Sequence, residues 1–221
     1  MTTVEQAHSR KWLSRRAVIV DASAVLFAKE GYHATSLTQI CEATKVGRGA
    51  FYYYIDSKEE LLSLIHDRVI VEILSGAERV CALGVSPSET LRLLGRDLLR
   101  ILTTYPEHVF VHIHELNSLT GERAKQFRAQ RRKYQVIVRR VLEQGVESGE
   151  FAIDDVHLTT LAWLSLHNYI YVWFRSEGRL TPMAIADNFS QIFIRGISTS
   201  VPIQMATSPG GGFSDQTNYR G

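Results

Sequence analysis

Residues 35–62 read TSLTQICEATKVGRGAFYYYIDSKEELL, and this stretch decides how the rest of the chain is interpreted. Thr35 or Ser36 can cap a short helix, residues 44–47 suit a tight turn, and Arg48 begins a second short helix. Neither helix is long enough to be stable alone, so each must pack against its neighbours. This order of elements is the pattern of a helix-turn-helix, and we interpret the second helix as a DNA-recognition helix.

The start of the second helix combines small residues with one long cation. Gly49 and Ala50 let the backbone approach a DNA groove closely, and Arg48 can pair with guanine O6 and N7 or with a phosphate. The N-terminus of the first helix, at Thr35 and Ser36, offers free N–H groups that suit a phosphate. These residues are therefore candidate DNA contacts.

Four aromatic residues in a row, Phe51 to Tyr54, follow this opening. Phe51 and Tyr54 are expected to face the core together, because residues three apart share one side of a helix. Tyr52 and Tyr53 then point toward DNA, with hydroxyls for phosphates and ring faces for thymine methyl groups. A plain aromatic core stripe is the alternative, but one turn of helix cannot bury four adjacent side chains on one face.

Ser57 and Glu60 form a capping-box pattern, which predicts that a long helix begins at residue 58. Lys58 lies in its first turn, where the positive end of the helix dipole disfavours a cation. A nearby phosphate would remove that conflict. We therefore add Lys58 to the candidate DNA contacts, together with Lys45 in the turn.

A basic cluster of Arg10, Lys11, Arg15 and Arg16 accompanies the start of the first predicted helix. These cations either contact DNA phosphates or form a solvated helix start, and the sequence leaves both interpretations open. The helix is expected to end at Gly31. Its inward apolar stripe is expected at Val18, Ala22, Val25 and Leu26, widened by Ile19 and Phe27.

The bulk composition bounds the class of protein. The 221 residues leave room for one large domain or two small ones, and 45% hydrophobic residues suffice for a buried core. A net charge of +2 means that any nucleic-acid contact is a local patch. Cys41 and Cys81 lack the spacing of a disulfide framework or zinc site. No secretory signal or membrane-spanning run is evident, so we expect a cytoplasmic protein with no membrane partner and no cofactor.

The rest of the chain predicts further helices, so the expected fold class is all-α. Capping residues mark where each helix begins. The expected helices run from Ser57 through Ile73, from Ser86–Pro87 to Pro106, from Glu122 to Glu147, from Asp154 or Asp155 to Glu177–Gly178, and from Thr181–Pro182 onward.

His108, His112 and Glu115 share one face of the segment that follows Pro106. Two histidines and one acid are an incomplete metal set, so a pocket wall or a solvent face is the main interpretation and a metal-responsive regulator is the alternative. The same groups, with His114, would supply acid–base chemistry in a helical enzyme. No nucleophile motif or phosphate loop accompanies them, and we expect no enzymatic activity.

The basic helix over 122–147 is either a solvated charged face or a clamp for an anionic effector, such as the phosphates of an acyl-CoA. The helix over 156–178 is apolar nearly all round, so both its sides must be buried. One side is expected to line a cavity and the other, with the last helix, to meet a second copy of the chain, although spacing does not say which is which. The candidate effector-binding residues are Phe110, His114, Arg128, Arg131, Tyr134, Trp163, His167 and Tyr171.

Two motifs carry a resemblance to a known family. F-A-x-x-G-Y-x-x-T-S at 27–36 and G-x-G-A-F-Y-Y-Y-I-D-S-K-E-E-L-L at 47–62 are similar to the N-terminal domain of the TetR family of bacterial repressors. The resemblance implies an all-helical homodimer whose three-helix head reads a palindromic operator and whose body binds a small molecule that releases the DNA. It places DNA contacts on Thr35, Ser36, Arg48, Gly49, Ala50, Tyr52, Tyr53 and Lys58.

This chain departs from the family pattern at Gly47 and Ala50, where members often carry hydroxyl residues, so base reading is expected to rest more on Arg48 and the tyrosines. W-F-R-S-E-G-R-L-T-P at 173–182, followed by F-x-x-I-F-x-x-G-I, is similar to TetR-family regulators of fatty-acid and steroid-ring breakdown, which respond to CoA thioesters. The expected domains are a flexible arm at 1–9, a DNA-binding head at 10–57, a ligand-binding and dimerisation body at 58–198, and a disordered tail at 199–221.

Overall fold

A computed structural model describes residues 3–175 and 177–199 of the chain. These residues form helices and connecting loops, with one isolated β-bridge between Phe151 and Ser198, so the expected all-α class is confirmed. The helices are α1 (Thr3–Glu30), α2 (Leu37–Thr44), α3 (Arg48–Tyr54), α4 (Lys58–Cys81), α5 (Pro87–Thr104), α6 (Pro106–His114), α7 (Gly121–Glu147), α8 (Val156–Asn168), α9 (Ile170–Trp173) and α10 (Pro182–Ile197).

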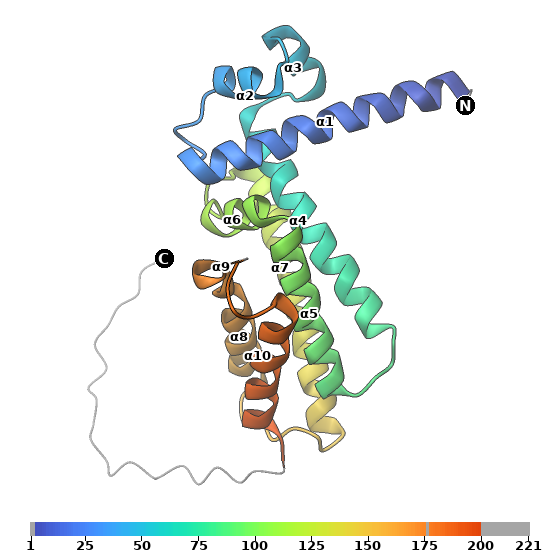
Figure 1. Cartoon of the computed structure of the whole chain (residues 1–221). Helices are drawn as coiled ribbons and strands as arrows, with labels where there is room; N and C mark the ends of the chain where they lie inside the picture. The colour runs from blue at the N-terminus through green and yellow to red at the C-terminus, as the bar shows by residue number, and fades with distance from the viewer. Residues whose placement is uncertain (1–2, 176, 200–221) are drawn as a thin grey trace.

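The molecule has a small head above an elongated body (Figure 1). α1 lies across the top of the body with α2 and α3 above it, and α4 runs from the head down into the body. α5 packs against α4, α7 and α10, while α6 lies beneath α1 and also contacts α4. Across residues 3–175 and 177–199, none of the helices combines the length and apolar character that crossing a membrane demands.

The recognition unit is held by local hydrogen bonds. The Ser36 hydroxyl accepts from the Gln39 backbone N–H, and the Gln39 side chain accepts from the Ser36 N–H, which completes a capping box at the start of α2. Lys45 ends α2 in the left-handed region, with φ of 53°. The chain then turns so that Val46 enters the core.

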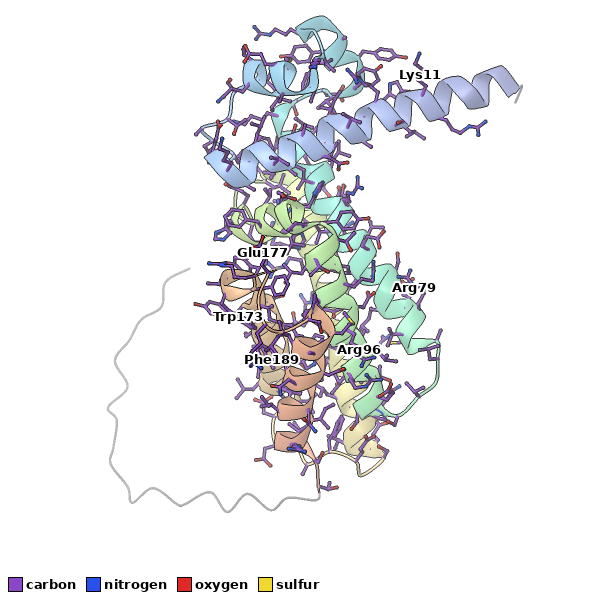
Figure 2. The ribbon with its side chains drawn as sticks, viewed as in Figure 1. Lys11, Arg79, Arg96, Trp173, Glu177 and Phe189 are labelled. Atoms are coloured by element: carbon purple, nitrogen blue, oxygen red, sulfur yellow. The ribbon has the colours of Figure 1, made fainter. Side chains whose placement is uncertain are left out.

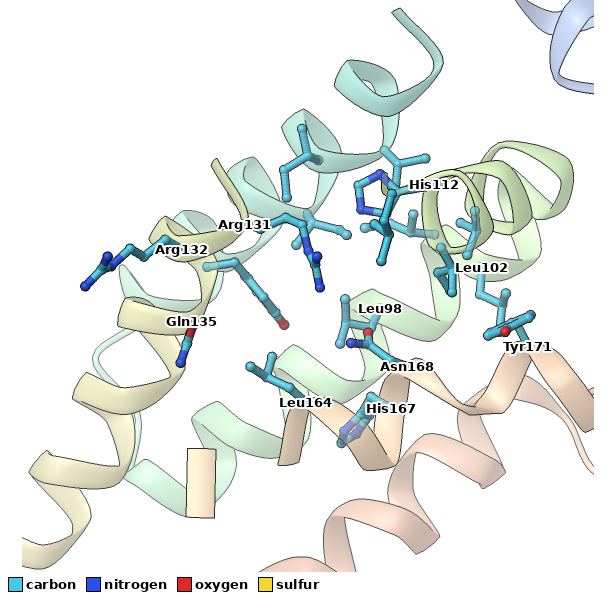
Figure 3. Close-up of a pocket in the computed structure, with 18 of the residues that line it drawn as sticks. Leu98, Leu102, His112, Arg131, Arg132, Gln135, Leu164, His167, Asn168 and Tyr171 are labelled. Carbon is cyan, nitrogen blue, oxygen red and sulfur yellow. The ribbon is translucent and has the colours of Figure 1, made fainter. Parts of the chain in front are cut away.

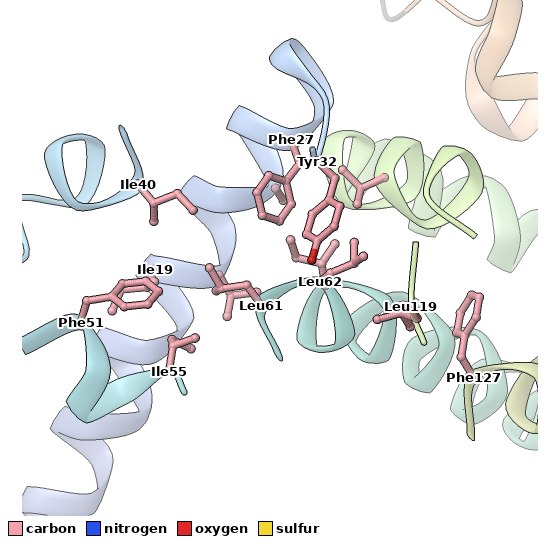
Figure 4. Packing of buried hydrophobic residues seen from close by; sticks show 14 of the residues in the cluster. Ile19, Phe27, Tyr32, Ile40, Phe51, Ile55, Leu61, Leu62, Leu119 and Phe127 are labelled. Atoms are coloured by element: carbon pink, nitrogen blue, oxygen red, sulfur yellow. The ribbon is translucent and has the colours of Figure 1, made fainter. Parts of the chain in front are cut away.

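The core of the head joins α1, α2, α3 and the first turns of α4 (Figure 4). Phe51 of α3, Ile40 of α2 and Ile19 of α1 belong to one buried cluster. The same cluster continues into the body through Leu119 and Phe127, so the core crosses the boundary expected at residues 57 and 58. Head and body are therefore packed together rather than joined by a linker.

The inward face of α1 differs from the expected one. Val18 and Val25 are exposed, because the face of α1 that packs on the rest of the head is rotated about the helix axis from the expected face. The rotation is about 100°, which corresponds to one residue position. Apolar residues occur on both the expected and the observed face, so helical periodicity alone did not identify the buried one. The buried residues of α1 are Ile19, Val20, Ser23, Ala24 and Phe27.

The two ends of the chain were expected to lack regular structure. α1 begins at Thr3, so residues 3–9, expected as a flexible arm, belong to the helix instead. Within the expected tail, Thr199 is tied to the body by hydrogen bonds to the backbone carbonyls of Gly149 and Glu150. Residues 200–221 lie outside the described residues.

The apolar helix expected over 156–178 is interrupted. α8 ends at Asn168, the short α9 follows, and Phe174 leaves the helical region with ψ of 135°. At the break, the Val172 N–H donates to the Tyr169 carbonyl, an i→i+3 bond that tightens the turn. The break redirects the aromatic side chains that follow it, which sequence periodicity could not show.

Candidate functional site

The exposed face of the head carries the predicted DNA contacts of α3. Arg48, Gly49 and Ala50 are exposed at its N-terminus. Tyr52 and Tyr53 are 46% and 62% exposed, whereas Phe51 is fully buried, so the predicted division of the aromatic run is confirmed. No atom lies within 4 Å of the position a Cβ would take at Gly49, which leaves open space in front of the helix. This surface has the shape and donors of a groove-reading helix end.

The start of α2 offers one hydroxyl to the outside and not two. Thr35 is 1% exposed, and its hydroxyl donates to the Gly31 carbonyl at 2.8 Å. That carbonyl follows the end of α1 and needs a partner, so Thr35 turns inward and its side chain is not available to DNA. The side chain of Thr35 thus faces inward in this structure, whereas the sequence predicts an outward contact. Ser36 remains exposed beside the free N–H groups of α2.

Lys58 already has partners inside the protein. Its ammonium donates to the His33 carbonyl at 3.2 Å and lies 4.6 Å from the centroid of the Tyr32 ring. Partial burial lowers the pKa of the Lys58 ammonium. The conflict with the helix dipole is thus relieved by a carbonyl and a ring, and a phosphate is not needed to explain this lysine. Lys45, in contrast, is exposed at the turn.

The basic cluster of α1 divides between two roles. Arg15 donates to the Thr44 carbonyl at 3.1 Å, and Arg16 binds the Tyr54 carbonyl and the Glu60 carboxylate. These two arginines therefore fasten α1 to α2, α3 and α4. Lys11 is exposed on the upper side of α1, at the same end of the molecule as α3 (Figure 2), where a phosphate contact stays a prediction.

A cavity of ≈ 710 Å³ lies in the body between α4, α5, α6, α7 and α8 (Figure 3). Its α4 and α5 walls are apolar, while α7 contributes four arginines. Its size falls in the range of small-molecule sites. The lining residues include Val69, Ile70, Ile73, Leu98, Leu99, Ile101, Leu102, Val109, His112, Ile113, Leu116, Arg128, Arg131, Arg132, Tyr134, Gln135, Arg139, His157, Leu164, His167, Asn168 and Tyr171.

The arginine wall lacks matching acids. Arg139 pairs with Glu143 at 3.2 Å, but Arg128, Arg131 and Arg132 form no ion pair with any carboxylate in residues 3–175 and 177–199. Burial lowers the pKa of the Arg131 guanidinium. Guanidinium groups without acids beside an apolar chamber suit a ligand that has both an anionic part and an apolar part.

Comparison with known proteins matches the N-terminal and C-terminal parts of the chain to two protein-family models. The model of the N-terminal domain of bacterial regulatory proteins of the tetR family matches residues 19–65. A second model, the tetracyclin repressor-like C-terminal domain, matches residues 84–197, which is more than half of the chain. The chain belongs to the TetR family. It is a transcriptional repressor with a helix-turn-helix head and a ligand-binding C-terminal domain, and its relatives are regulators rather than enzymes.

Several relatives match over most of the chain. The transcriptional repressor KstR2 of Rhodococcus jostii is 26% identical over 192 residues, covering 84% of this chain and 92% of the relative. The crystal structure of PfmR from Thermus thermophilus is 29% identical with a TM-score of 0.75, covering 80% of this chain and 97% of that one. The structure of AibR with isovaleryl coenzyme A and operator DNA is 28% identical with a TM-score of 0.74 and the same two coverages.

Within this TetR-family body, five of the predicted effector-binding residues line the cavity: Arg128, Arg131, Tyr134, His167 and Tyr171. Three others were misplaced. Phe110 and His114 stack on each other, with ring centroids 4.2 Å apart, beside the cavity and not in its lining. Trp163 is fully buried, 4.1 Å from the ring of His167, because the α8 backbone turns it toward the body core.

Sequence reasoning missed most of the cavity. The apolar side chains of α4 and α5 read as ordinary core positions, and the sequence offered no signal that they face a void. Arg132 and Arg139 were noted as part of a basic helix but not as lining residues. Gln135 and Asn168 also line the TetR-family cavity, and only the assembled helices show this.

The face shared by His108, His112 and Glu115 does not form a metal site. His108 Nε2 lies 3.1 Å from Asp21 Oδ1, and Glu115 accepts from the Tyr32 N–H and the Ser118 hydroxyl. Across the described ranges no three His, Cys, Asp or Glu side chains gather as a metal site would require. The metal-responsive alternative thus loses its geometric basis, because the three groups have separate partners.

His112 has a partner that the sequence did not indicate. Its Nδ1 lies 3.4 Å from Nδ1 of His66 on α4, and both rings pack against Phe127. Burial lowers the pKa of His66 to about 4 and that of His112 to about 3, so both imidazoles are neutral at pH 7. His112 also lines the cavity, so this pair links the cavity wall to the core that the head and body share.

Proposed function

We propose that this TetR-family repressor binds a palindromic operator as a homodimer and is released from it by an acyl-CoA thioester. The observation that carries the proposal is the cavity: its apolar chamber borders three arginines that have no acidic partner in the described part of the chain. The chamber suits an acyl chain, and the guanidinium groups suit the phosphates of coenzyme A.

Related proteins support the proposed class of effector. AibR has been crystallised with isovaleryl coenzyme A and operator DNA, and it is 28% identical to this chain, with 80% of this chain and 97% of AibR covered. Arg128 and Arg132 are one helical turn apart on α7, and both are exposed at the lining of the cavity. Two guanidinium groups at this spacing can bind neighbouring phosphates of one ligand.

The proposed dimer forms through α8 and α10. Apolar side chains remain exposed on these helices and on α9 between them, and a run of exposed apolar residues on one side marks an interaction surface. A twofold contact would bury the same patch on both copies. Trp173 and Phe189, whose ring centroids are 5.7 Å apart, lie together on this side of the body (Figure 2). The exposed residues are Leu158, Leu161, Tyr169, Val172, Trp173, Leu180, Met183 and Ile192.

The proposed mechanism is a two-state coupling through α6. One side of α6 meets the head, where Asp21 of α1 faces both His108 at 3.1 Å and Arg68 at 3.0 Å. Further along the same helix, His112 and Ile113 line the cavity. A ligand that displaces α6 would tilt the two heads away from the ~34–36 Å spacing of successive major grooves. It shifts the equilibrium only as far as its affinities for the two states differ.

DNA binding of this kind would take place in the cytoplasm, where a bacterial chromosome lies.

The test of the proposed function is a gel-shift assay on the DNA upstream of the protein's own coding region, repeated with coenzyme A, hexanoate and hexanoyl-CoA. Release by hexanoyl-CoA, but not by hexanoate or coenzyme A alone, is expected, because the site needs both the anionic and the apolar part.

Variants identify the cavity as the site of action. The double variant Arg128→Gln/Arg132→Gln should keep its operator affinity and need on the order of tenfold or more thioester for release, because it loses charge-assisted contacts to phosphate. Lys133→Gln removes an exposed charge of α7 outside the lining and should behave as wild type. Release that is unchanged in the double variant would rule out the arginine wall as the phosphate site.

A further inference from the structure

Two adjacent arginines of α7 take opposite directions at the cavity. Arg131 extends into the chamber toward Leu98, whereas Arg132 points away from it (Figure 3). Neighbouring residues on a helix diverge by about 100°, so one cation is placed inside and one outside by geometry alone. The outer guanidinium can meet the phosphates of a ligand, and the inner one is left for a different group.

Arg131 extends into the chamber without a counter-charge, and its side chain is accessible from the open space of the cavity. No carboxylate in residues 3–175 and 177–199 forms an ion pair with it, and the ring centroid of Phe127 is 6.0 Å from its guanidinium carbon. Loss of bulk water around it lowers the pKa of the guanidinium. A guanidinium that faces an open cavity and has no carboxylate beside it can bind an anionic group of a ligand.

The surroundings of Arg131 narrow the kind of partner. Asn168, at the end of α8, places its amide in the same chamber between Leu98 and Leu164, below Arg131 (Figure 3). The amide donates and accepts hydrogen bonds, while both leucines are apolar. The chamber therefore places a cation and an amide next to the apolar side chains of Leu98 and Leu164.

We propose that Arg131 and Asn168 form an interior carboxylate subsite, so that the preferred effector has a carboxylate on its acyl part. The effector class is then the CoA monothioester of a dicarboxylic acid. This inference rests on the acyl-CoA function proposed above. A thioester carbonyl is uncharged and cannot neutralise Arg131, and the phosphates have the outer arginines, whereas a carboxylate matches the guanidinium fork in charge and shape.

The test compares adipoyl-CoA with hexanoyl-CoA, two ligands of equal chain length that differ in the terminal carboxylate. Isothermal titration calorimetry measures the affinity of both ligands for the wild-type protein, Arg131→Gln, Arg131→Lys and the control Arg140→Gln. The control removes an exposed charge of α7 that lies outside the cavity lining. Wild type and control should bind adipoyl-CoA about tenfold or more tightly than hexanoyl-CoA.

Arg131→Gln should lower the affinity for adipoyl-CoA by on the order of 30-fold, because the terminal carboxylate of the ligand is left unpaired in the chamber. It should leave hexanoyl-CoA unchanged or more tightly bound, because an unpaired cation is gone. Arg131→Lys should restore part of the preference, since it keeps the charge but not the planar fork. Thermal unfolding of each variant shows that the fold is retained.

Two results would overturn the subsite. One is equal binding of the two thioesters by the wild-type protein. The other is an equal loss of affinity for both thioesters in Arg131→Gln, which would mean that Arg131 contacts the coenzyme A part of the ligand. If neither thioester binds, the acyl-CoA function is wrong, and the subsite is decided with octanoate against octanol. If Arg131→Gln loses binding of octanoate but not of octanol, the carboxylate subsite is supported. If the wild-type protein binds the two ligands equally, the subsite is refuted.

Discussion

His66 and His112 face each other across the boundary between the DNA-binding head and the effector cavity, with their Nδ1 atoms 3.4 Å apart. In a neutral pair one ring donates and the other accepts, so the two imidazoles hold different tautomers. Both rings are buried, and Phe127 packs on them from α7. A polar contact in such surroundings helps to fix how α4 and α6 meet, because a buried hydrogen bond is lost if the two rings move apart.

Removing one ring of this pair should cost more than removing both. His66→Phe or His112→Phe leaves the other imidazole without its buried partner, with an expected loss of about 1–3 kcal/mol in the free energy of unfolding. The double variant replaces both by rings of similar size and should recover much of that loss. Chemical denaturation of the four proteins at pH 7.5 measures the coupling. Additive losses would show that the pair contributes no mutual stabilisation.

The stability of the protein should fall as the pH is lowered through the histidine range. Burial lowers the pKa of His66 to about 4, of His112 to about 3 and of His167 to about 4, each from an ordinary value of 6.5. Below pH 6.5 the unfolded chain therefore binds protons that the folded chain does not, so the free energy of unfolding decreases as the pH falls. Each such group contributes up to about 1.4 kcal/mol per pH unit.

Denaturation curves between pH 7.5 and 4.5 check this pH dependence. The His66→Phe/His112→Phe double variant should show a shallower decline than wild type, because two of the four buried imidazoles of the described residues are gone. His157→Gln, at an exposed position early in α8, should keep the wild-type slope. A double variant with the full wild-type slope would mean that other groups cause the acid loss.

Gly145 and Gly196 should respond in opposite ways to alanine. Both are helical, and helix propensity alone favours alanine at each by up to about 1 kcal/mol. A Cβ at Gly145, however, would lie 2.0 Å from the ring of buried Phe151, whereas nothing lies within 4 Å of one at Gly196. Gly145→Ala should therefore destabilise the fold by about 1–3 kcal/mol, and Gly196→Ala should be neutral or stabilising. Thermal unfolding distinguishes them, and a stabilised Gly145→Ala would show that Phe151 can move aside.

The exposure of the α3 side chains could be predicted from the sequence because local rules decide it. Phe51 and Tyr54 share a side of α3 by helical spacing, so Tyr52 and Tyr53 had to face outward. Thr35 shows where those rules stop. A hydroxyl beside a helix start can cap it, face DNA or, as here, satisfy the Gly31 carbonyl, and only the packing of α1 against α2 chooses between these roles.

The cavity could be predicted only in part because side chains from six helices, α4 to α9, line it. Arg131 and His167 were identified from the unusual charge of α7 and the apolar character of α8. Trp163 shares a helical face with His167, yet the core takes one side chain and the cavity the other. Leu98 lines a void but reads as an ordinary core leucine. Whether an apolar side chain meets another side chain or empty space depends on tertiary packing, which has no local signature.

Arg48 and Lys45 should affect operator binding in different ways. Arg48 stands at the exposed N-terminus of α3, so Arg48→Ala should remove about 1–3 kcal/mol of discrimination against altered base pairs. Lys45 lies in the turn and suits a phosphate, so Lys45→Ala should weaken all sequences alike and flatten the salt dependence by about one unit. Arg79→Ala, an exposed change at the far end of α4 (Figure 2), is the control. Competition gel shifts with wild-type and mutated operators at several salt concentrations give both quantities. Unchanged discrimination in Arg48→Ala would mean that other groups read the bases.

Two exposed apolar residues of similar accessibility separate the proposed dimer surface from an ordinary surface. Ile192 on α10 is 62% exposed and Leu83, in the loop between α4 and α5, is 61% exposed. Ile192→Glu would place an unpaired charge in the twofold contact of α8 and α10, and should weaken dimerisation by on the order of 100-fold or more. Operator affinity should fall with it, because each head would then bind its half-site independently. Leu83→Glu adds the same charge away from the proposed contact and should change neither quantity. Light scattering across a dilution series, with thermal unfolding to show that the fold is kept, measures the effect. A dimer that survives Ile192→Glu but dissociates in Leu83→Glu would move the interface to the α4–α5 end of the body.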